Sequence, residues 1–476
     1  MAWLPVVGCA ATLQASSPEA VVRALVEALN TKDKAKIAAF VKAHATDDLP
    51  AETRVERMLD LAEQGAPFKI VGAITRDGNS LKLKLEDTNG IQLNMLATMK
   101  GDPPKLAGIR AAPAGASEAT FKDYSDLGSL QDMVKAVVTD SKIPAMSAST
   151  IRAGKTETAT FGVRELGTSA QPGVDEPWKV GSIGKSLCST VIGTLIDEGK
   201  LKFETTLKEA LPGFKMLPEY ESVTLEQVMH HRSGLPADPG MRRPQVEAII
   251  GDAKAPQEIR DKYIANVLMR KGQYAPGTRF DYSNAGYAVL AKVIEVATGQ
   301  PYESALKQRV FQKLRLQHSF TRIDPLPQEH PSGHMPGPDG LKPVVFDGPM
   351  TIMFAGAGGG IWMSTSDLAK YGQAHLDGLK GKAGLLRPET VFRLHKGEQE
   401  DPEGNRSYGC GWGIVKERGL PIKHGHNGSD GTFRAELAIY PDLDLVVAAI
   451  SNAGGESEPT PGELVFWSVA KRAQKG

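Results

Sequence analysis

The sequence is poor in cysteine, has no long apolar run and carries no excess of charge of either sign. Its 476 residues include three cysteines, Cys9, Cys188 and Cys410, which form neither a CxxC pair nor a metal-ligand spacing. No stretch approaches the roughly 18 apolar residues that a membrane-spanning helix requires. Lysine plus arginine and aspartate plus glutamate number 56 each, so the chain shows no electrostatic footprint for nucleic acid or an anionic membrane. We therefore expect no nucleic-acid partner, no membrane span, no metal and no cofactor.

What is present is an ordinary globular composition over a long chain. The hydrophobic fraction is 41% and the charged fraction is 24%, close to the average of soluble proteins. A chain of 476 residues exceeds the size of one ordinary domain, so we predict two or three domains with sizeable cores.

Residues 1–16 resemble the later part of a secretory signal, because they are apolar first and then small and polar. Within them, Val6-Val7-Gly8-Cys9 is similar to a bacterial lipobox, in which Cys9 would carry a lipid. The pattern predicts an exported protein, periplasmic or secreted, with a lipid anchor at Cys9 as a further prediction. The alternatives are a frayed N-terminus and a cytoplasmic location.

Residues 17–113 predict a small α+β domain. Apolar residues recur at helical spacing between Val21 and Leu61, and four strand-like stretches follow. Asp77-Gly78 and Asn89-Gly90 lie between such stretches, where hairpin turns are expected. Helices followed by an antiparallel sheet resemble the NTF2-like or cystatin-like fold. We see no catalytic constellation here and interpret the segment as an accessory domain, with substrate binding as the alternative.

Residues 114–126 are interpreted as a linker and residues 127–476 as a larger α+β domain. Strands are predicted near both ends of this domain, while its middle is rich in helices and loops. This order predicts one sheet built from both chain ends, with a large helical insertion. The predicted elements are strands at Ala145–Arg152, Glu157–Arg164, Thr432–Tyr440 and Leu445–Ser451, and helices at Ser182–Glu198 and Gly462–Lys471.

The first motif with chemical meaning is Ser182-Ile183-Gly184-Lys185. Ser182 lies where a loop becomes a helix, after Gly181, and residues three apart share a helix face. Lys185 is therefore expected beside the Ser182 hydroxyl, where a lysine can remove the serine proton if its surroundings lower its pKa. The helix start also offers backbone N–H groups to a developing oxyanion.

The second motif is Tyr282-Ser283-Asn284. A tyrosine held near a lysine ammonium can shuttle protons between a nucleophile and a leaving group. An asparagine can donate its amide N–H to a substrate carbonyl. Taken alone, a tyrosine in a loop is more often a packing residue.

The third motif is Gly425-His426-Asn427-Gly428-Ser429, in which two glycines allow the backbone to approach a ligand closely. The N–H of Ser429 could pair with that of Ser182 as an oxyanion hole. His426 could polarise a substrate group or bind a carboxylate.

Two of these motifs have duplicates. The SxxK spacing recurs at Ser304–Lys307 and Ser468–Lys471, which we interpret as solvated faces of amphipathic helices. The HxG pattern recurs at His395-Lys396-Gly397, interpreted as a helix end at the surface, and His424 is interpreted as structural.

The SxxK motif is followed after about 100 residues by YxN, and YxN is followed after about 140 residues by HxG. In this order and spacing of motifs, the chain resembles the serine β-lactamase and penicillin-binding-protein superfamily. It is similar to class C β-lactamases, D-alanyl-D-alanine carboxypeptidases, D-aminopeptidases and family VIII esterases, from about Leu127 to the C-terminus. The stretches that carry the resemblance, beside the three motifs, are Lys179–Ser186, Thr224–Gln227, His231–Pro236, Tyr274–Tyr287, Gly358–Thr365 and Asp367–Ala369.

The resemblance implies a sheet flanked by helices plus an all-helical region, with the site in the cleft between them. It implies that Ser182 is acylated, that Lys185 is its base and that Tyr282 relays protons and helps to activate water. It also implies that the substrate is bound by Asn284, His426, Gly428 and Ser429.

The chain departs from class C enzymes at the third motif, where those enzymes usually carry Lys-Thr-Gly. Histidine at position 426 resembles the peptidase and esterase branches and weighs against efficient β-lactam hydrolysis. Asn284 favours the peptidase branch. Arg242 and Arg243 lie where such folds line the cleft and could bind a substrate carboxylate, with an exposed basic loop as the alternative.

The sequence thus predicts a serine hydrolase that cleaves an ester or an amide bond through an acyl-enzyme on Ser182. Its substrate is a small molecule or a peptide, with peptidoglycan-derived compounds among the candidates. A β-lactamase or D-alanyl-D-alanine carboxypeptidase is the first alternative, and a catalytically silent peptidoglycan-binding or sensor protein is the second. A metal hydrolase has no HExxH motif to support it, and the adjacent side chains of His230 and His231 are expected to diverge. The oligomeric state and the identity of the substrate do not follow from the sequence.

Overall fold

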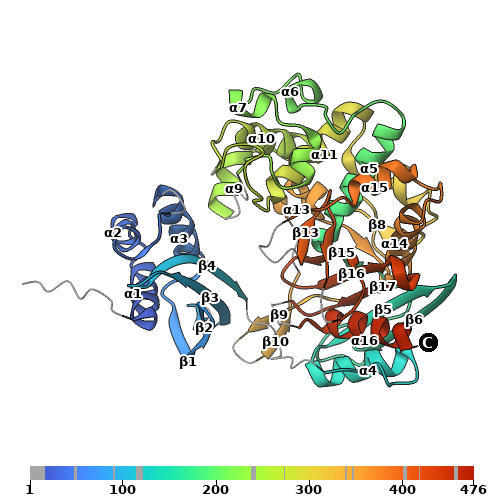
Figure 1. Ribbon diagram of the computed structural model, residues 1–476, viewed down its shortest axis with the longest axis horizontal. Helices are drawn as coiled ribbons and strands as arrows, with labels where there is room; N and C mark the ends of the chain where they lie inside the picture. Colours follow the sequence, from blue (N-terminus) through green and yellow to red (C-terminus); the bar gives the residue numbers. More distant parts are fainter. Residues whose placement is uncertain are drawn as a thin grey trace, which may run out of the picture. The chain divides into compact units, whose positions relative to one another are not determined.

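The computed structural model describes most of the chain, and its described residues form two compact units divided between Ala114 and Gly115 (Figure 1). The described ranges are 17–47, 51–88, 90, 92–113, 122–236, 243–272, 274–337, 340–345, 348–399, 405–416, 419–454 and 459–475. Cys9, Asn89, Arg242 and residues 114–121 of the predicted linker lie outside them, and only the backbone of Arg243 is described. Within these ranges, no helix is long and apolar enough to cross a bilayer.

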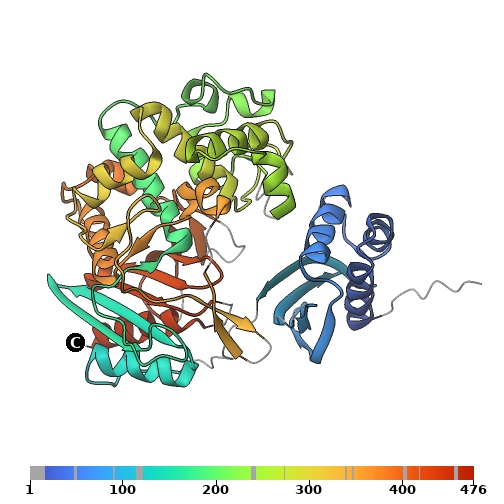
Figure 2. The ribbon, with the colours of Figure 1, turned by 180° about the vertical axis from the view of Figure 1, so that it is seen from behind.

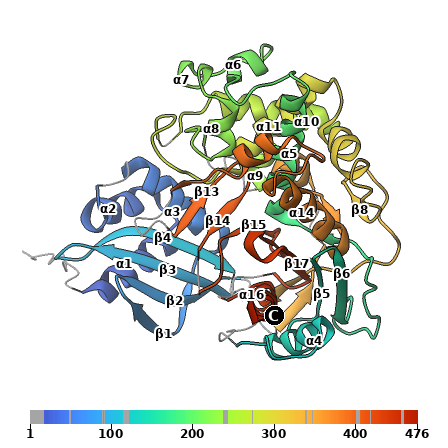
Figure 3. The ribbon, with the colours of Figure 1, turned by 45° about the vertical axis from the view of Figure 1, so that its right-hand side comes forward.

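The first unit has three helices followed by a four-stranded antiparallel sheet, which is the predicted order (Figure 3). Ser17 and Asp33 fix the starts of the first two helices, because their side chains accept hydrogen bonds from backbone N–H groups of the first turn. The core includes the fully buried Leu25 and Leu85. The elements are α1 (Pro18–Asn30), α2 (Lys34–His44), α3 (Ala51–Gly65), β1 (Lys69–Asp77), β2 (Ser80–Glu86), β3 (Gln92–Lys100) and β4 (Lys105–Pro113).

The second unit is built on an eight-stranded antiparallel sheet with the order β12-β13-β14-β15-β16-β17-β5-β6. The C-terminal strand β17 pairs with β5 along its whole length, so the sheet joins both ends of the unit as predicted. The strands are β5 (Ala145–Arg152), β6 (Lys155–Gly162), β12 (Glu398–Gln399), β13 (Arg406–Tyr408), β14 (Gly413–Val415), β15 (Lys423–Ser429), β16 (Arg434–Tyr440) and β17 (Leu445–Ser451).

Helices cover both faces of this sheet, which explains why all seven residues of β17 are buried. α4 (Leu130–Ser141) and α16 (Pro461–Lys475) pack together on one face (Figure 1). On the other face, α14 (Thr365–Leu379) packs on β5, β16 and β17, and α15 (Pro388–Leu394) packs on α14. Ser468 of α16 is buried and accepts a hydrogen bond from the N–H of Tyr124 at 3.0 Å. The prediction of a solvated face for Ser468 was therefore wrong.

The middle of the second unit forms an all-helical region, seen together in Figure 2. Its helices are α6 (Leu207–Ala210), α7 (Pro218–Glu221), α8 (Leu225–Met229), α9 (Arg243–Ile250), α10 (Pro256–Leu268), α11 (Asn284–Thr298), α12 (Tyr302–Leu306) and α13 (Pro349–Met353). Two small sheets complete the unit: β7 (Trp178–Lys179), β11 (Trp362–Met363) and β8 (Ser319–Phe320), and the hairpin of β9 (His334–Gly337) and β10 (Gly340–Pro343).

Candidate active site

Ser182 lies in a single 3-10 turn, η1 (Gly181–Ile183), which leads directly into α5 (Gly184–Asp197). The α-helix thus begins two residues later than predicted, and Ser182 belongs to the tight turn before it. Gly181 makes this turn possible, because its φ of +50° is a conformation that other residues rarely adopt. A Cβ atom at Gly181 would also clash with the backbone of Ser429.

Lys185 is fully buried, and its amine contacts oxygen atoms from three different segments of the chain. Its Nζ lies 3.0 Å from Oγ of Ser182, 2.6 Å from Oδ1 of Asn284 and 3.4 Å from the carbonyl oxygen of Ala357. The expected juxtaposition of Ser182 and Lys185 is therefore observed. In its neutral form, the Lys185 amine could accept the Ser182 proton across the same contact.

The second predicted motif also contacts the Lys185 amine, through the ring of Tyr282 and the amide oxygen of Asn284. The Lys185 Nζ lies 4.7 Å from the centre of the Tyr282 ring. Ser283 is the N-cap of α11, and its side chain accepts the N–H of Gly286 at 2.9 Å. This cap sets the start of the helix at Asn284, with Tyr282 just before it.

The third predicted motif lies on β15, which passes against η1. A Cβ atom at Gly428 would clash with the carbonyl oxygen of Val180 and would lie 2.9 Å from the N of Ser182. Glycine at 181 and at 428 therefore permits direct backbone contact between the two segments. The backbone N atoms of Ser182 and Ser429 belong to these adjoining segments, because a Cβ atom at Gly428 would lie 2.9 Å from the first and a Cβ atom at Gly181 would lie 2.4 Å from the second.

His426 is held as a neutral imidazole. Its Nδ1 lies 2.5 Å from the carbonyl oxygen of Asn427, so Nδ1 donates a hydrogen bond there. Its Nε2 lies 2.9 Å from the hydroxyl of Tyr408 and accepts from it. Burial, helped by the nearby charge of Lys185, lowers the pKa of His426 to about 3. At neutral pH this side chain therefore carries no positive charge, and both of its ring nitrogens have partners within the protein.

His231 is a site residue whose role the sequence did not reveal. Its backbone is left-handed, with φ +57°, and its carbonyl accepts the N–H of Asp281 at 2.8 Å. Its Nδ1 accepts the N–H of Ser283 at 3.0 Å, and its ring centre lies 4.3 Å from that of Tyr282. His231 thus fixes the backbone on both sides of Tyr282. Its position in the stretch His231–Pro236 was the only signal in the sequence.

His230 serves a different partner, because its Nδ1 lies 2.9 Å from the carbonyl oxygen of Tyr408. Among the described residues, no group of three histidine, cysteine, aspartate or glutamate side chains is placed to hold a metal ion.

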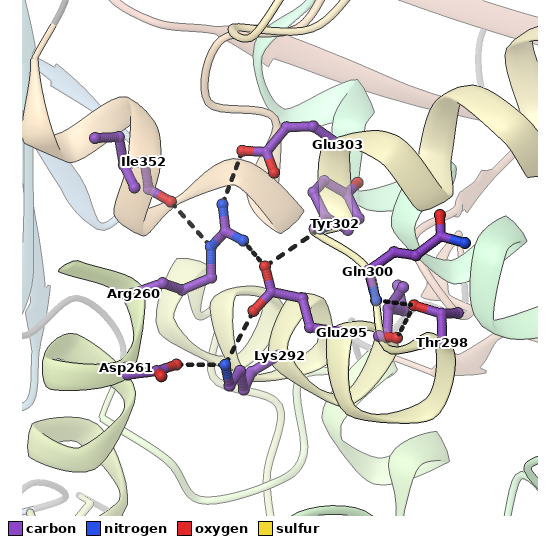
Figure 4. A network of polar contacts seen from close by, with 10 residues as sticks. Arg260, Asp261, Lys292, Glu295, Thr298, Gln300, Tyr302, Glu303 and Ile352 are labelled. Atoms are coloured by element: carbon purple, nitrogen blue, oxygen red, sulfur yellow. Dashed lines mark hydrogen bonds and ion pairs between the residues drawn. The ribbon is translucent and has the colours of Figure 1, made fainter. Parts of the chain in front are cut away.

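A buried ion network supports the segment that supplies the Ala357 carbonyl (Figure 4). Arg260 is fully buried, pairs with Glu295, and places its guanidinium 2.8 Å from Glu303. Its Nε also donates to the carbonyl oxygen of Ile352 at 3.3 Å. These contacts tie α10, α11 and α12 to α13, which precedes the glycine-rich segment 356–360 beside Ser182.

A chain of three histidines, two buried and one half-buried, connects α5 with β15. His375 contacts Thr190 at 3.0 Å and His395 at 3.0 Å, and His395 contacts His424 at 3.2 Å. His395 is the C-cap of α15, as predicted for a helix end, but it is only 4% exposed, so its predicted surface position was wrong. Burial lowers the pKa of all three, to about 3 for His375 and about 4 for His424. The chain is therefore neutral at neutral pH.

Cys188 and Cys410 are fully buried, and burial raises the pKa of both thiols. Both therefore stay protonated at neutral pH, which makes them poor nucleophiles.

Comparison with known proteins places this geometry in a family. The beta-lactamase family profile matches residues 130–466, which is most of the second unit. This chain belongs to the beta-lactamase family. Membership confirms the resemblance seen in the sequence, the β-lactamase-like α+β fold and the predicted class of serine hydrolase.

Several proteins that resemble this chain share about a quarter of its residues or fewer in the aligned parts. Penicillin-binding protein 4 of Amycolatopsis lactamdurans is 25% identical over 343 residues, which cover 68% of this chain and 84% of that protein. A beta-lactamase of Pseudomonas fluorescens is 26% identical over 292 residues, covering 61% and 74%. The solved D-amino acid amidase of Ochrobactrum anthropi SV3 shares the fold, with a TM-score of 0.60 at 20% identity, over 73% of this chain and 96% of that one. The chain spans two thirds or less of the length of several other curated relatives.

Proposed function

We propose that this member of the beta-lactamase family hydrolyses an ester or an amide bond through an acyl-enzyme on Ser182. The observation that carries the proposal is the 3.0 Å contact between the buried Lys185 amine and the Ser182 hydroxyl. A serine without a base is a weak nucleophile, and this contact supplies the base.

In acylation, Lys185 removes the Ser182 proton as Oγ attacks the substrate carbonyl carbon. The oxyanion that forms is stabilised by the N–H groups of Ser182 and Ser429. The bond to the leaving group then breaks, and the leaving oxygen or nitrogen takes a proton through Tyr282. In deacylation, Tyr282 helps to take a proton from a water molecule that attacks the acyl carbon, and Ser182 leaves with a proton returned by Lys185.

Asn284 and His426 orient the substrate in this proposal. Asn284 directs Oδ1 at Lys185, which leaves its amide N–H groups for a substrate carbonyl. His426 is neutral, so it offers no ion pair to a carboxylate beside the scissile bond. This favours esters and amides that carry no negative charge at that position.

The second candidate is a penicillin-binding enzyme of the β-lactamase or D-alanyl-D-alanine carboxypeptidase type. The names of the relatives support it, and the serine, lysine, tyrosine and asparagine of the motifs are all in place. The neutral His426 weighs against it, because such substrates carry a carboxylate next to the bond that is cleaved. A silent binding protein is the remaining alternative, and the intact Ser182–Lys185 contact weighs against it.

Labelling with a fluorescent fluorophosphonate tests the proposal, with p-nitrophenyl ester hydrolysis as a second readout. We expect the wild type to be labelled and the Ser182→Ala variant to remain unlabelled. Ser304→Ala is the matched control, because Ser304 belongs to a duplicate SxxK spacing, and it should label like the wild type. Labelling by a fluorescent penicillin would favour the second candidate. A wild type that neither labels nor hydrolyses esters would support the silent binding protein instead.

We also propose that the protein is exported and that the first unit is an accessory domain. The signal-like composition of residues 1–16 supports export, with lipidation at Cys9 as the finer form of the proposal. None of the proposed catalytic or substrate-binding residues comes from residues 17–113. Cell fractionation, together with the mass of the mature N-terminus, tests both export and lipidation.

A further inference from the structure

The second unit contains a cavity of about 350 Å³. Several residues in its walls lie close in sequence to residues of the active site. Lys179 lines it and lies three residues before Ser182. Gly360 lines it and follows Gly358, whose backbone lies against Gly181. Phe433 lines it, and the Phe433 carbonyl accepts a hydrogen bond from the Ser429 hydroxyl at 2.8 Å. The volume lies in the usual range of sites for small molecules.

One side of the cavity is aromatic. The ring of Trp362 lies edge-to-face against Phe433 at 5.5 Å and against His330 at 5.3 Å. Pro343 and Val344 add further apolar surface. A flat or extended apolar group would bury its surface against this wall.

Most of the polar groups in the lining already have partners inside the protein. Lys179 pairs with Asp430 at 2.8 Å, and the carboxylate of Glu165 accepts the Ser332 hydroxyl at 2.6 Å. Asp324 accepts both the backbone N–H and the hydroxyl of Thr321 at 2.9 Å, and it also pairs with Lys307.

Arg322 is the exception in this lining. Its Nε is buried and makes no hydrogen bond, and across the described ranges its guanidinium forms no ion pair. A guanidinium with an unmet buried donor at the wall of a cavity is a binding group for a carboxylate, which it can hold with two parallel hydrogen bonds. Leaving the buried Nε–H unmet costs free energy.

We infer that this cavity binds the acyl arm of the substrate and that the arm is an apolar chain ending in a carboxylate. The inference rests on the proposed acylation of Ser182. The walls of the cavity come from the segments of the oxyanion hole, at Lys179 and Phe433, and no described lining residue comes from the Tyr282–Asn284 segment that would protonate the leaving group. On this inference, the acyl side of the scissile bond faces the cavity. The apolar part of the arm lies on Trp362 and Phe433, and its carboxylate pairs with Arg322.

The test compares pairs of p-nitrophenyl esters that differ only at the end of the acyl chain. Octanoate is paired with the half ester of suberate, and hexanoate with the half ester of adipate. We expect the wild type to prefer one half ester over its uncharged partner by about tenfold in kcat/KM, the size expected for hydrogen bonds to a charged group. Arg322→Gln should abolish this preference while the uncharged esters stay within about twofold of wild type. Arg315→Gln, at an exposed arginine, should keep the preference.

The uncharged esters separate the failure of this inference from the failure of the proposed function. If octanoate and hexanoate are hydrolysed but neither half ester is preferred, or if Arg322→Gln keeps a preference, the carboxylate pocket is overturned and the acyl-enzyme stands. If no ester is hydrolysed, the proposed function fails, and the inferred carboxylate site in the cavity is then tested by a binding measurement alone. Calorimetric titration of monoethyl suberate into Ser182→Ala should then show binding that Arg322→Gln removes, and no binding overturns the inference.

Discussion

His231 holds the turn that carries Tyr282 from both sides, through its carbonyl oxygen on Asp281 and its Nδ1 on Ser283. Its ring also lies 5.0 Å from that of Tyr408, the residue that donates to His426. One buried imidazole therefore contacts two aromatic residues of the site, one before α11 and one on β13. Burial and the charge of Lys185 keep the pKa of His231 well below its usual value, so its Nδ1 remains a hydrogen-bond acceptor at neutral pH.

Substitution of His231 should therefore lower kcat more than it raises KM. His231→Phe keeps an aromatic ring but loses the acceptor for Ser283, and we expect kcat to fall by about tenfold or more because Tyr282 shifts. His231→Asn should recover most of the rate, because asparagine tolerates a left-handed backbone and its Oδ1 can replace Nδ1. Steady-state kinetics on a p-nitrophenyl ester provides the measurement. A larger loss in His231→Asn than in His231→Phe would mean that His231 acts through packing and not through its Nδ1.

His426 should not titrate in the physiological range. Its pKa of about 3 means that the imidazole is neutral above pH 4. NMR spectra of protein with 13C-labelled histidine test this. The His426 resonance is assigned as the one that is absent from the His426→Gln variant, and its chemical shift in the wild type should stay constant between pH 5 and 8. An inflection of that resonance near pH 6.5 would show that the site holds a cation, and the argument against carboxylate substrates would then fail.

Glu436 should make the second unit less stable as pH rises. Its carboxyl group is 1% exposed, contacts Thr460, and has its pKa raised from 4.5 to about 7, mainly by burial and also by Glu463. Below pH 4.5 the group is neutral in both the folded and the unfolded chain. Between pH 4.5 and 7 the unfolded chain ionises first, so the free energy of unfolding falls, by about 3 kcal/mol in total, and changes no further above pH 7.

The comparison with Glu436→Gln isolates this effect. Unfolding in urea can be followed by tryptophan fluorescence, because four of the five tryptophans lie in the second unit. The difference in unfolding free energy between wild type and Glu436→Gln should change with pH from 4.5 to 7, whereas the exposed Glu389→Gln control should track the wild type. A constant difference across this range would show that Glu436 is ionised in the folded protein.

Loss of Arg260 should destabilise the second unit strongly. Arg260→Met leaves Glu295 and Glu303 buried without their cation, which costs about 3–5 kcal/mol. Arg387→Met is the matched control, because Arg387 is 62% exposed and its pair with Asp197 should be worth less than about 1 kcal/mol. Urea unfolding should show this contrast, and equal midpoints for the two variants would contradict it.

The parts of the site that could be predicted from sequence are those set by local geometry. Lys185 follows Ser182 by three residues and therefore faces it across the turn into α5. Tyr282, Asn284 and the HxG segment were identified by their order along the chain. Tyr282 and Asn284 meet at the Lys185 amine because α11 packs on α5, and no spacing along the chain predicts that contact.

The parts that sequence did not reveal depend on which segments cover one another. His231 and Tyr408 come from segments far apart in the chain, and no spacing connects them. His395 and Ser468 were assigned to the surface because amphipathic spacing identifies the two faces of a helix but not what packs on the second face. In the structure, Trp412 stacks on His395 and the N–H of Tyr124 reaches Ser468.

The central claim is that Ser182 is the residue that becomes acylated. Mass spectrometry after treatment with a fluorophosphonate, first on the intact protein and then on its peptides, tests this most directly. We predict a single added phosphonyl group, located on the peptide that contains Ser182 and absent from Ser182→Ala. A group located on any other residue, or retained in Ser182→Ala, would contradict the account.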